Sequence, residues 1–227
     1  MKSFSMLFKP LALSIALLSI LAVSSSEARA DEVTIAGYTN GAFNNPAPPN
    51  TSATQTASLF GLTYVNSTIL PGTTVNGFRG IGGNPTAPPT QNTNNLGAFN
   101  LANTQAVYNG NTFTLRVTFT APTGINGGNT SLFSATLMGS VLSNGDGGAQ
   151  IDFNNTPILF TFSNASASGS FFFSVNDVTL DPGQTASITG QITAAQQTAI
   201  PEPTTMLLLG TGLAGVASRI RKRRKSA

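Results

Sequence analysis

The feature that most constrains the fold of this chain is an alternation of apolar and polar residues with a period of two. It is clearest in the segment NTFTLRVTFTAP, residues 111–122. Successive side chains of a β-strand point to opposite faces, so this segment places four apolar residues on one face and threonines with Arg116 on the other. The apolar residues are Phe113, Leu115, Val117 and Phe119. The segment is therefore predicted to be a half-buried antiparallel strand that ends at Pro122.

Eight further segments of the chain have a similar pattern. They are EVTIAGY from Glu32, SLFGLTYV from Ser58, GAFNL from Gly97, SLFSATLMGSVL from Ser131, AQIDF from Ala149, PILFTF from Pro157, SFFFSVNDVTL from Ser170 and ASITGQIT from Ala186. Turn signals such as Asn109-Gly110 and Asp181-Pro182-Gly183 separate them. The fold class predicted for residues 31–193 is all-β, an antiparallel β-sandwich ectodomain of about nine strands.

Two segments rich in proline and asparagine interrupt this pattern. They are NNPAPPNTSATQT from Asn44 and GGNPTAPPTQNTNN from Gly82. Their composition does not supply core residues, so we expect long surface loops or extended edge segments. Such loops can bind a ligand, but flexible surface decoration is the commoner outcome.

The N-terminal 30 residues have the layout of a secretory signal peptide. Lys2 and Lys9 form a positive region, an apolar stretch runs over residues 11–23, and the small residues Ala28 and Ala30 follow. We expect a signal peptide over residues 1–30, helical in its apolar part and cleaved after Ala30 by signal peptidase. A retained N-terminal helix is the alternative, but the apolar stretch is short for a membrane span.

The C-terminal segment has the composition of a membrane anchor. Residues 194–200, AAQQTAI, are small and mostly polar and are predicted to form a linker. The apolar stretch from Thr204 to Ile220 would form a transmembrane helix of roughly 26 Å, slightly shorter than the ~30 Å hydrocarbon core. A basic cluster follows, and it should stay on the cytoplasmic side. It consists of Arg219, Arg221, Lys222, Arg223, Arg224 and Lys225.

Three features of residues 201–227 together resemble the PEP-CTERM sorting signal of Gram-negative bacteria. They are Pro201-Glu202-Pro203, an apolar stretch that contains Gly210, Gly212 and Gly215, and the basic cluster. The resemblance implies that an exosortase, a membrane-embedded cysteine transpeptidase-like enzyme, recognises the Pro-Glu-Pro and removes the segment. The membrane would then be a transient partner. The glycines of the span are either helix contact points or simply tolerated there.

The residue types of the body exclude several classes of chemistry. The chain has no cysteine and no histidine, and residues 31–200 contain no lysine. Triads with an imidazole, thiolate catalysis, Schiff bases and ordinary zinc sites are thereby excluded. Carboxylates remain, and Asp146, Asp152, Asp177 and Asp181 are the candidates for a glycosidase pair. Turn and strand-end roles explain each of them, so we expect no enzyme and no cofactor.

Calcium is the best candidate for a bound metal ion. The segment NGDGGAQID places Asn144, Asp146 and Asp152 around a glycine-rich turn, and calcium prefers hard oxygen ligands. The alternative is a hairpin loop in which Asn and Asp bond to their own backbone.

The charges of the body exclude nucleic acid as a partner. Residues 31–200 contain two arginines against six carboxylates, a net charge of −4, so they offer no basic face. The resulting expectation is an exported protein, transiently anchored in the inner membrane and then delivered to the outer surface or extracellular matrix. A structural or adhesive role with exopolysaccharide or biofilm is expected. The alternatives are a calcium-stabilised adhesin or a carbohydrate-binding module, whose candidate aromatic residues are Tyr38, Tyr64 and Tyr108.

Overall fold

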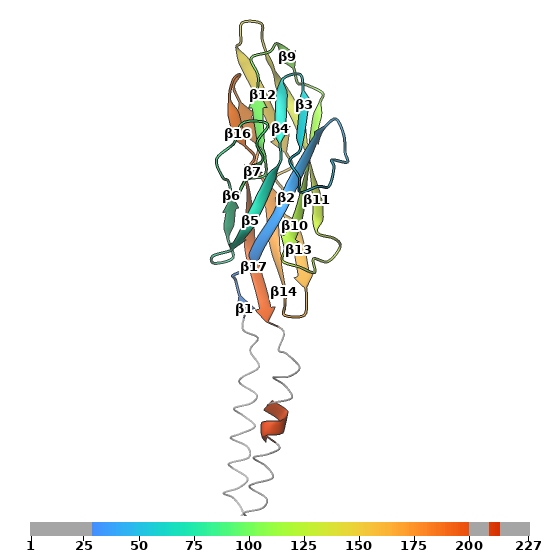
Figure 1. Cartoon of the computed structure of the whole chain (residues 1–227), viewed down its shortest axis with the longest axis vertical. Coiled ribbons are helices and arrows are strands. Elements are labelled where there is room, and N and C mark those ends of the chain that lie inside the picture. Colours follow the sequence, from blue (N-terminus) through green and yellow to red (C-terminus); the bar gives the residue numbers. More distant parts are fainter. Residues whose placement is uncertain (1–28, 200–208, 214–227) are drawn as a thin grey trace, which may run out of the picture.

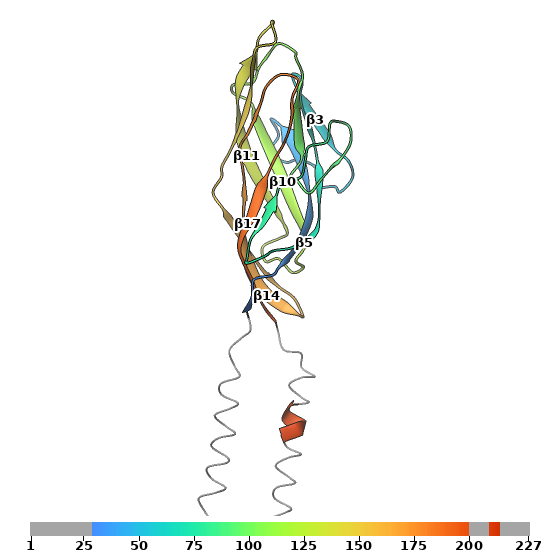
Figure 2. The same ribbon diagram turned by 90° about the vertical axis from the view of Figure 1, so that its left-hand side faces the viewer.

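The computed structural model describes residues 29–199 and 209–213. Residues 29–199 form an elongated body of β-strands, and both ends of this body lie at the same end of its long axis (Figures 1 and 2). The expected signal-peptide helix and most of the expected transmembrane helix lie outside the described residues. Residues 209–213 form a short helical segment. Within the described part of the chain, no helix has the length and apolar character needed to cross a membrane.

Within residues 29–199, seventeen strands form three sheets. The eight-stranded sheet has the order β15-β12-β11-β10-β2-β5-β7, with β9 also paired to β11. Its strands are β2 (Thr34–Phe43), β5 (Ser67–Thr73), β7 (Asn92–Thr93), β9 (Ala106–Val107), β10 (Thr112–Ala121), β11 (Thr130–Val141), β12 (Gly147–Phe153) and β15 (Val178–Leu180).

The other two sheets are smaller. The five-stranded sheet has the order β1-β17-β14-β13, with β6 also paired to β17, and the four-stranded sheet has the order β16-β8-β4-β3. Their strands are β1 (Arg29–Ala30), β3 (Thr56–Leu59), β4 (Leu62–Val65), β6 (Arg79–Ile81), β8 (Ala98–Leu101), β13 (Ile158–Ser163), β14 (Ala167–Val175), β16 (Thr185–Ser187) and β17 (Gly190–Ala199). One sheet of the three is a curled half-barrel.

The prediction of an all-β body is confirmed, but about nine strands was too low. Nine of the seventeen strands have only two to four residues, too few to show an alternating pattern. Pairing is antiparallel in every named pair except β5 with β7, which is parallel. β7 lies inside the second proline-rich segment and at the edge of the eight-stranded sheet, so this part of the segment is one of the extended edge segments that we expected as an alternative to a loop.

Aromatic side chains join the eight-stranded sheet to both smaller sheets. At one end, Phe119 of β10 packs on phenylalanines of β13 and β14, with ring centroids 5.0–5.4 Å apart. Nearer the other end, Phe113 of β10 contacts Phe99 of β8 at 4.9 Å and Tyr64 of β4 at 5.0 Å. One alternating strand, β10, therefore supplies the core residues that connect all three sheets.

The polar face of β10 is covered as well. Thr114 and Thr118 are buried, although their strand was predicted to face solvent on that side. The first proline-rich segment lies over this face: Arg116 Nε donates to the Pro48 carbonyl at 2.9 Å, and Thr118 Oγ1 donates to Asn50 Oδ1 at 3.2 Å. This loop is part of the packed structure rather than loose decoration, because it covers the polar side of the central strand.

Candidate functional site

The two ends of the described body are hydrogen-bonded neighbours. β1 pairs antiparallel with β17, in the register Arg29 with Thr198 and Ala30 with Gln197. Ala28 lies outside the described residues, but Ala30, the other small residue of the predicted cleavage site, belongs to this edge strand. The Ala30–Asp31 bond therefore lies beside the strand that leads into the C-terminal tail.

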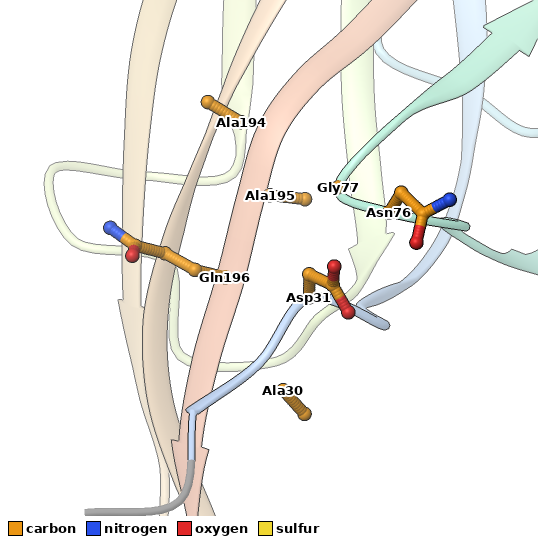
Figure 3. Close-up of a pocket in the computed structure, with 7 residues that line it drawn as sticks. All are labelled: Ala30, Asp31, Asn76, Gly77, Ala194, Ala195 and Gln196. Carbon is orange, nitrogen blue, oxygen red and sulfur yellow. The ribbon is translucent and has the colours of Figure 1, made fainter.

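A cavity of about 440 Å³ opens next to this pairing (Figure 3). The end of β1, the turn between β5 and β6, and β17 contribute its walls. Its lining residues are Ala30, Asp31, Asn76, Gly77, Ala194, Ala195 and Gln196. The walls combine backbone, three alanine side chains, two side-chain amides and one carboxylate, so the cavity does not contain a set of residues for acid–base catalysis.

Hydrogen bonds fix the backbone around this cavity. Thr74 Oγ1 donates to the Asp31 carbonyl at 2.5 Å and accepts from the Val33 amide at 2.7 Å. The Ala195 amide donates to the Gly77 carbonyl at 3.0 Å. Asn76 and Gly77 both have positive φ, as an Asn-Gly hairpin turn requires. The Asn-Gly pair indicates a turn in the sequence, but this turn was not among those predicted.

The predicted linker at residues 194–200 is wrong as far as Ala199. β17 runs through these residues and pairs with β14 up to Ala167 with Ala199. The small polar composition reflects a strand with a bulge: Ala194 has a φ of 49° and Ala195 is buried. The bulge breaks the alternation, which is why the segment did not show a strand pattern.

The sorting-signal residues themselves lie mostly beyond the described part. Pro201, Glu202, Pro203, Gly215 and the basic cluster are outside it. Gly210 and Gly212 fall in the helical segment at 209–213, where a Cβ added at either position would have no described atom within 4 Å apart from the adjacent residues and the backbone of the same helix. Only Ile200 separates the end of β17 from Pro201 in the sequence.

The structure does not bring the calcium candidates together. Asn144 and Asp146 lie in the β11–β12 turn, where Asn144 Nδ2 donates to Asp146 Oδ2 at 2.5 Å and the Asp146 amide donates to Asn144 Oδ1 at 3.1 Å. Asp152 lies on β12 opposite Thr136, five residues beyond Gly147 and thus roughly 17 Å along the strand. The hairpin interpretation is therefore the one that the geometry supports. No cluster of three or more His, Cys, Asp or Glu side chains is found within the described ranges.

The tyrosines considered for sugar binding do not form a platform. Tyr64 and Tyr108 are fully buried in the core. Tyr38 is partly buried, and its hydroxyl donates to Asn50 Oδ1 at 2.9 Å. Substituting Tyr64 or Tyr108 would disturb the core, so these changes cannot locate a sugar site.

We expect Tyr64 to make the stability of the domain sensitive to alkaline pH. Burial raises the pKa of Tyr64 and outweighs the opposite effect of its 3.1 Å hydrogen bond with Thr39. The folded state thus favours the protonated phenol. The contribution of Tyr64 to the free energy of unfolding is therefore intact below about pH 10, and it falls as the pH rises above that value, by up to about 1.4 kcal/mol per pH unit.

Urea unfolding between pH 8 and pH 11.5 measures this loss. We expect Tyr64→Phe to lower stability at pH 8, since the hydroxyl also donates to the Leu96 carbonyl, but to flatten the alkaline decline. Tyr38→Phe is the control and should keep the decline. An equal decline in the Tyr64→Phe and parent proteins would contradict the assignment.

The two proline-rich segments, residues 44–56 and 82–95, contact each other. Gln91 Nε2 donates to the Ser52 carbonyl at 3.1 Å. Buried asparagines hold each segment: Asn66 Nδ2 donates to the Ala53 carbonyl at 2.8 Å, and Asn92 Oδ1 accepts from the Thr86 amide at 2.7 Å. These asparagines bond to the backbone of the loops, and neither segment contains an aromatic residue that could stack on a sugar ring.

Comparison with known proteins gives one family match. Residues 199–224 match the family model described as the PEP-CTERM protein-sorting motif. No curated protein and no solved structure matches the chain. The matched range begins at the last residue of β17, so the motif directly follows the folded body. The chain therefore carries a PEP-CTERM protein-sorting motif at its C terminus, which implies an exported, exosortase-sorted protein of the cell surface.

Proposed function

We propose that this protein is a non-enzymatic structural or adhesive component of the outer surface or extracellular matrix, associated with exopolysaccharide or biofilm material. The observation that carries the proposal is the sorting motif directly after the last strand of a folded β-domain. The residue types of the body support it, since residues 31–200 contain no histidine, cysteine or lysine for catalysis.

The shape of the domain supports an outward-facing role. Both ends of the described body lie at one end of the long axis, so the opposite end points away from the point of attachment (Figures 1 and 2). At that far end, the β3–β4 turn, β9 and the β11–β12 turn expose Phe60, Val107 and Leu142. The residue after β9 is linked to the β3–β4 turn, because Tyr108 Oη donates to the Phe60 carbonyl at 3.0 Å. Apolar side chains displayed in this way suit contact with a partner in the matrix.

Mass spectrometry of the exported protein tests the sorting step. In cells with the exosortase we expect the mature form to begin at Asp31 and to lack the segment that follows the Pro-Glu-Pro. In matched cells without the exosortase, the chain should keep Ala227 and stay with the membrane fraction.

A variant with alanine at positions 201, 202 and 203 is the matched control. It keeps the apolar stretch and the basic cluster, so it should enter the membrane but keep Ala227 even in the presence of the exosortase. An exported parent protein that still ends at Ala227 in exosortase-containing cells would indicate a permanent anchor and contradict the proposal.

A further inference from the structure

The end of β17 is held along both of its edges. On one edge β14 pairs with it up to Ala199. On the other edge β6 pairs with Gly190 to Ile192, the Gly77 carbonyl accepts from the Ala195 amide, and β1 pairs with Gln197 and Thr198. The residues that precede the sorting motif therefore belong to the sheet and do not form a free linker.

β1, which pairs with the end of β17 on the second edge, comes from the predicted signal peptide. Arg29 and Ala30 are its last two residues, and hydrolysis of the Ala30–Asp31 bond would separate them from the domain. Asp31 would stay, because its carbonyl accepts the hydrogen bond from Thr74. Loss of β1 opens the edge of β17 at Gln197 and Thr198, beside the cavity that Asp31 and Asn76 line (Figure 3).

The sorting signal begins very close to this ladder. Pro201 is the second residue after Ala199, so at most about 7 Å of chain lies between them. An enzyme that holds Pro201-Glu202-Pro203 in its active site must also reach the residues on either side. Access to the signal therefore requires the end of β17 to separate from its neighbours, and each neighbour opposes that separation.

We propose that β1 is a temporary restraint on the sorting signal, so that removal of the signal peptide is the step that gives the exosortase access to the tail. This inference rests on the proposed function. In the first step water hydrolyses the Ala30–Asp31 bond, giving a carboxyl group on Ala30 and an amino group on Asp31. After this step β17 still pairs with β14, but it has lost its second partner at Gln197 and Thr198. The exosortase can then reach the sorting signal more easily.

A chain with an uncleavable signal peptide tests this order in exosortase-containing cells. Ala28→Phe blocks signal peptidase, which needs small residues at its cleavage site, and leaves Arg29 and Ala30 in place. Pulse-chase labelling with mass analysis then follows the loss of the tail. Because two cross-strand pairs persist, we expect tail removal to be roughly 2- to 30-fold slower than in the parent chain.

Two further variants separate the pairing from other effects of a retained signal peptide. Adding Arg29→Pro and Ala30→Pro to Ala28→Phe removes both amides of β1, and tail removal should return to nearly the parent rate. A six-residue Gly-Ser insertion after Ala199 moves the signal away from the sheet, and in that background Ala28→Phe should have no effect.

The outcomes are distinct. An unchanged rate in the Ala28→Phe chain overturns the restraint, and so does an equal slowing in the chain with the insertion, which would assign the effect to membrane retention. A slowed Ala28→Phe chain that is restored by the proline changes supports it. Absence of tail removal in the parent chain would instead overturn the proposed function itself.

Discussion

Phe119→Ala is expected to destabilise the domain by about 3–5 kcal/mol, the cost of removing a large buried aromatic side chain. Phe119 is 1% exposed, and its ring lies 5.0, 5.3 and 5.4 Å from those of Phe160, Phe171 and Phe173. All three contacts are edge-to-face, which adds to the apolar burial. The change would leave a cavity between β10 of the eight-stranded sheet and β13 and β14 of the five-stranded sheet. A domain of this size has only about 5–15 kcal/mol of stability in total.

Phe172→Ala is the matched control, since it makes the same chemical change between two of the contacting residues on β14. Its side chain is on the other face of the strand and is 37% exposed, so we expect a loss of about 1 kcal/mol or less. Urea unfolding of both variants measures the difference. Equal losses in the two variants would show that β10 does not pack on β13 and β14 as described.

The core was predictable because strand alternation alone determines which side chains share a face. Phe113, Leu115, Val117 and Phe119 were predicted on one face of a strand, and all four are buried. The alternation does not indicate which other strands each strand packs against. The contact of Phe119 with Phe171 and Phe173 depends on which sheets face each other, and it joins residues more than 50 positions apart.

The polar segments were harder to predict because their roles depend on backbone groups. Asn50 belongs to a segment that was expected to be a surface loop or an edge segment, yet its Oδ1 accepts the hydrogen bond from Thr118 that helps to hold the segment over β10. Asn66, outside that segment, donates to its Ala53 carbonyl. An asparagine that bonds to solvent and one that bonds to a buried backbone group have the same local sequence pattern. Only the folded arrangement distinguishes the two.

The candidate site was predictable in its motif and not in its surroundings. Pro201-Glu202-Pro203 with the apolar stretch and the basic cluster was sufficient to identify the sorting motif, which the family match confirms. The pairing of β1 with β17 joins residues near opposite ends of the chain, and neither strand alternates clearly. Ala194 adopts a positive φ, which a local reading of AAQQTA does not indicate.

Arg79→Met is expected to destabilise the domain by about 2–4 kcal/mol, because one guanidinium satisfies three backbone carbonyls. Arg79 Nη1 donates to the carbonyls of Ile35 and Gly72, the latter at 2.8 Å, and Nη2 donates to the Leu70 carbonyl at 2.8 Å. Arg79 belongs to β6, which pairs with β17, whereas its acceptors belong to β2 and β5. The side chain therefore ties the five-stranded sheet to the eight-stranded sheet. Burial lowers the pKa of Arg79, but a guanidinium stays protonated over the whole accessible pH range.

Arg116→Met removes the same charge from the only other arginine of residues 31–200, so it controls for net charge. The one hydrogen bond of Arg116 given by the structure runs from Nε to the Pro48 carbonyl at 2.9 Å, and we expect a loss of about 1 kcal/mol. Arg79→Lys should fall between the two, since a single ammonium cannot reach three carbonyls in the fork geometry of a guanidinium. Equilibrium unfolding in urea at neutral pH, repeated at high salt, separates these contributions. If Arg79→Met and Arg116→Met lose the same stability, net charge explains the effect and the three carbonyl bonds do not. A larger loss for Arg79→Met that persists at high salt would show that Arg79 links the two sheets. The end of the domain next to the sorting motif would then depend on this link.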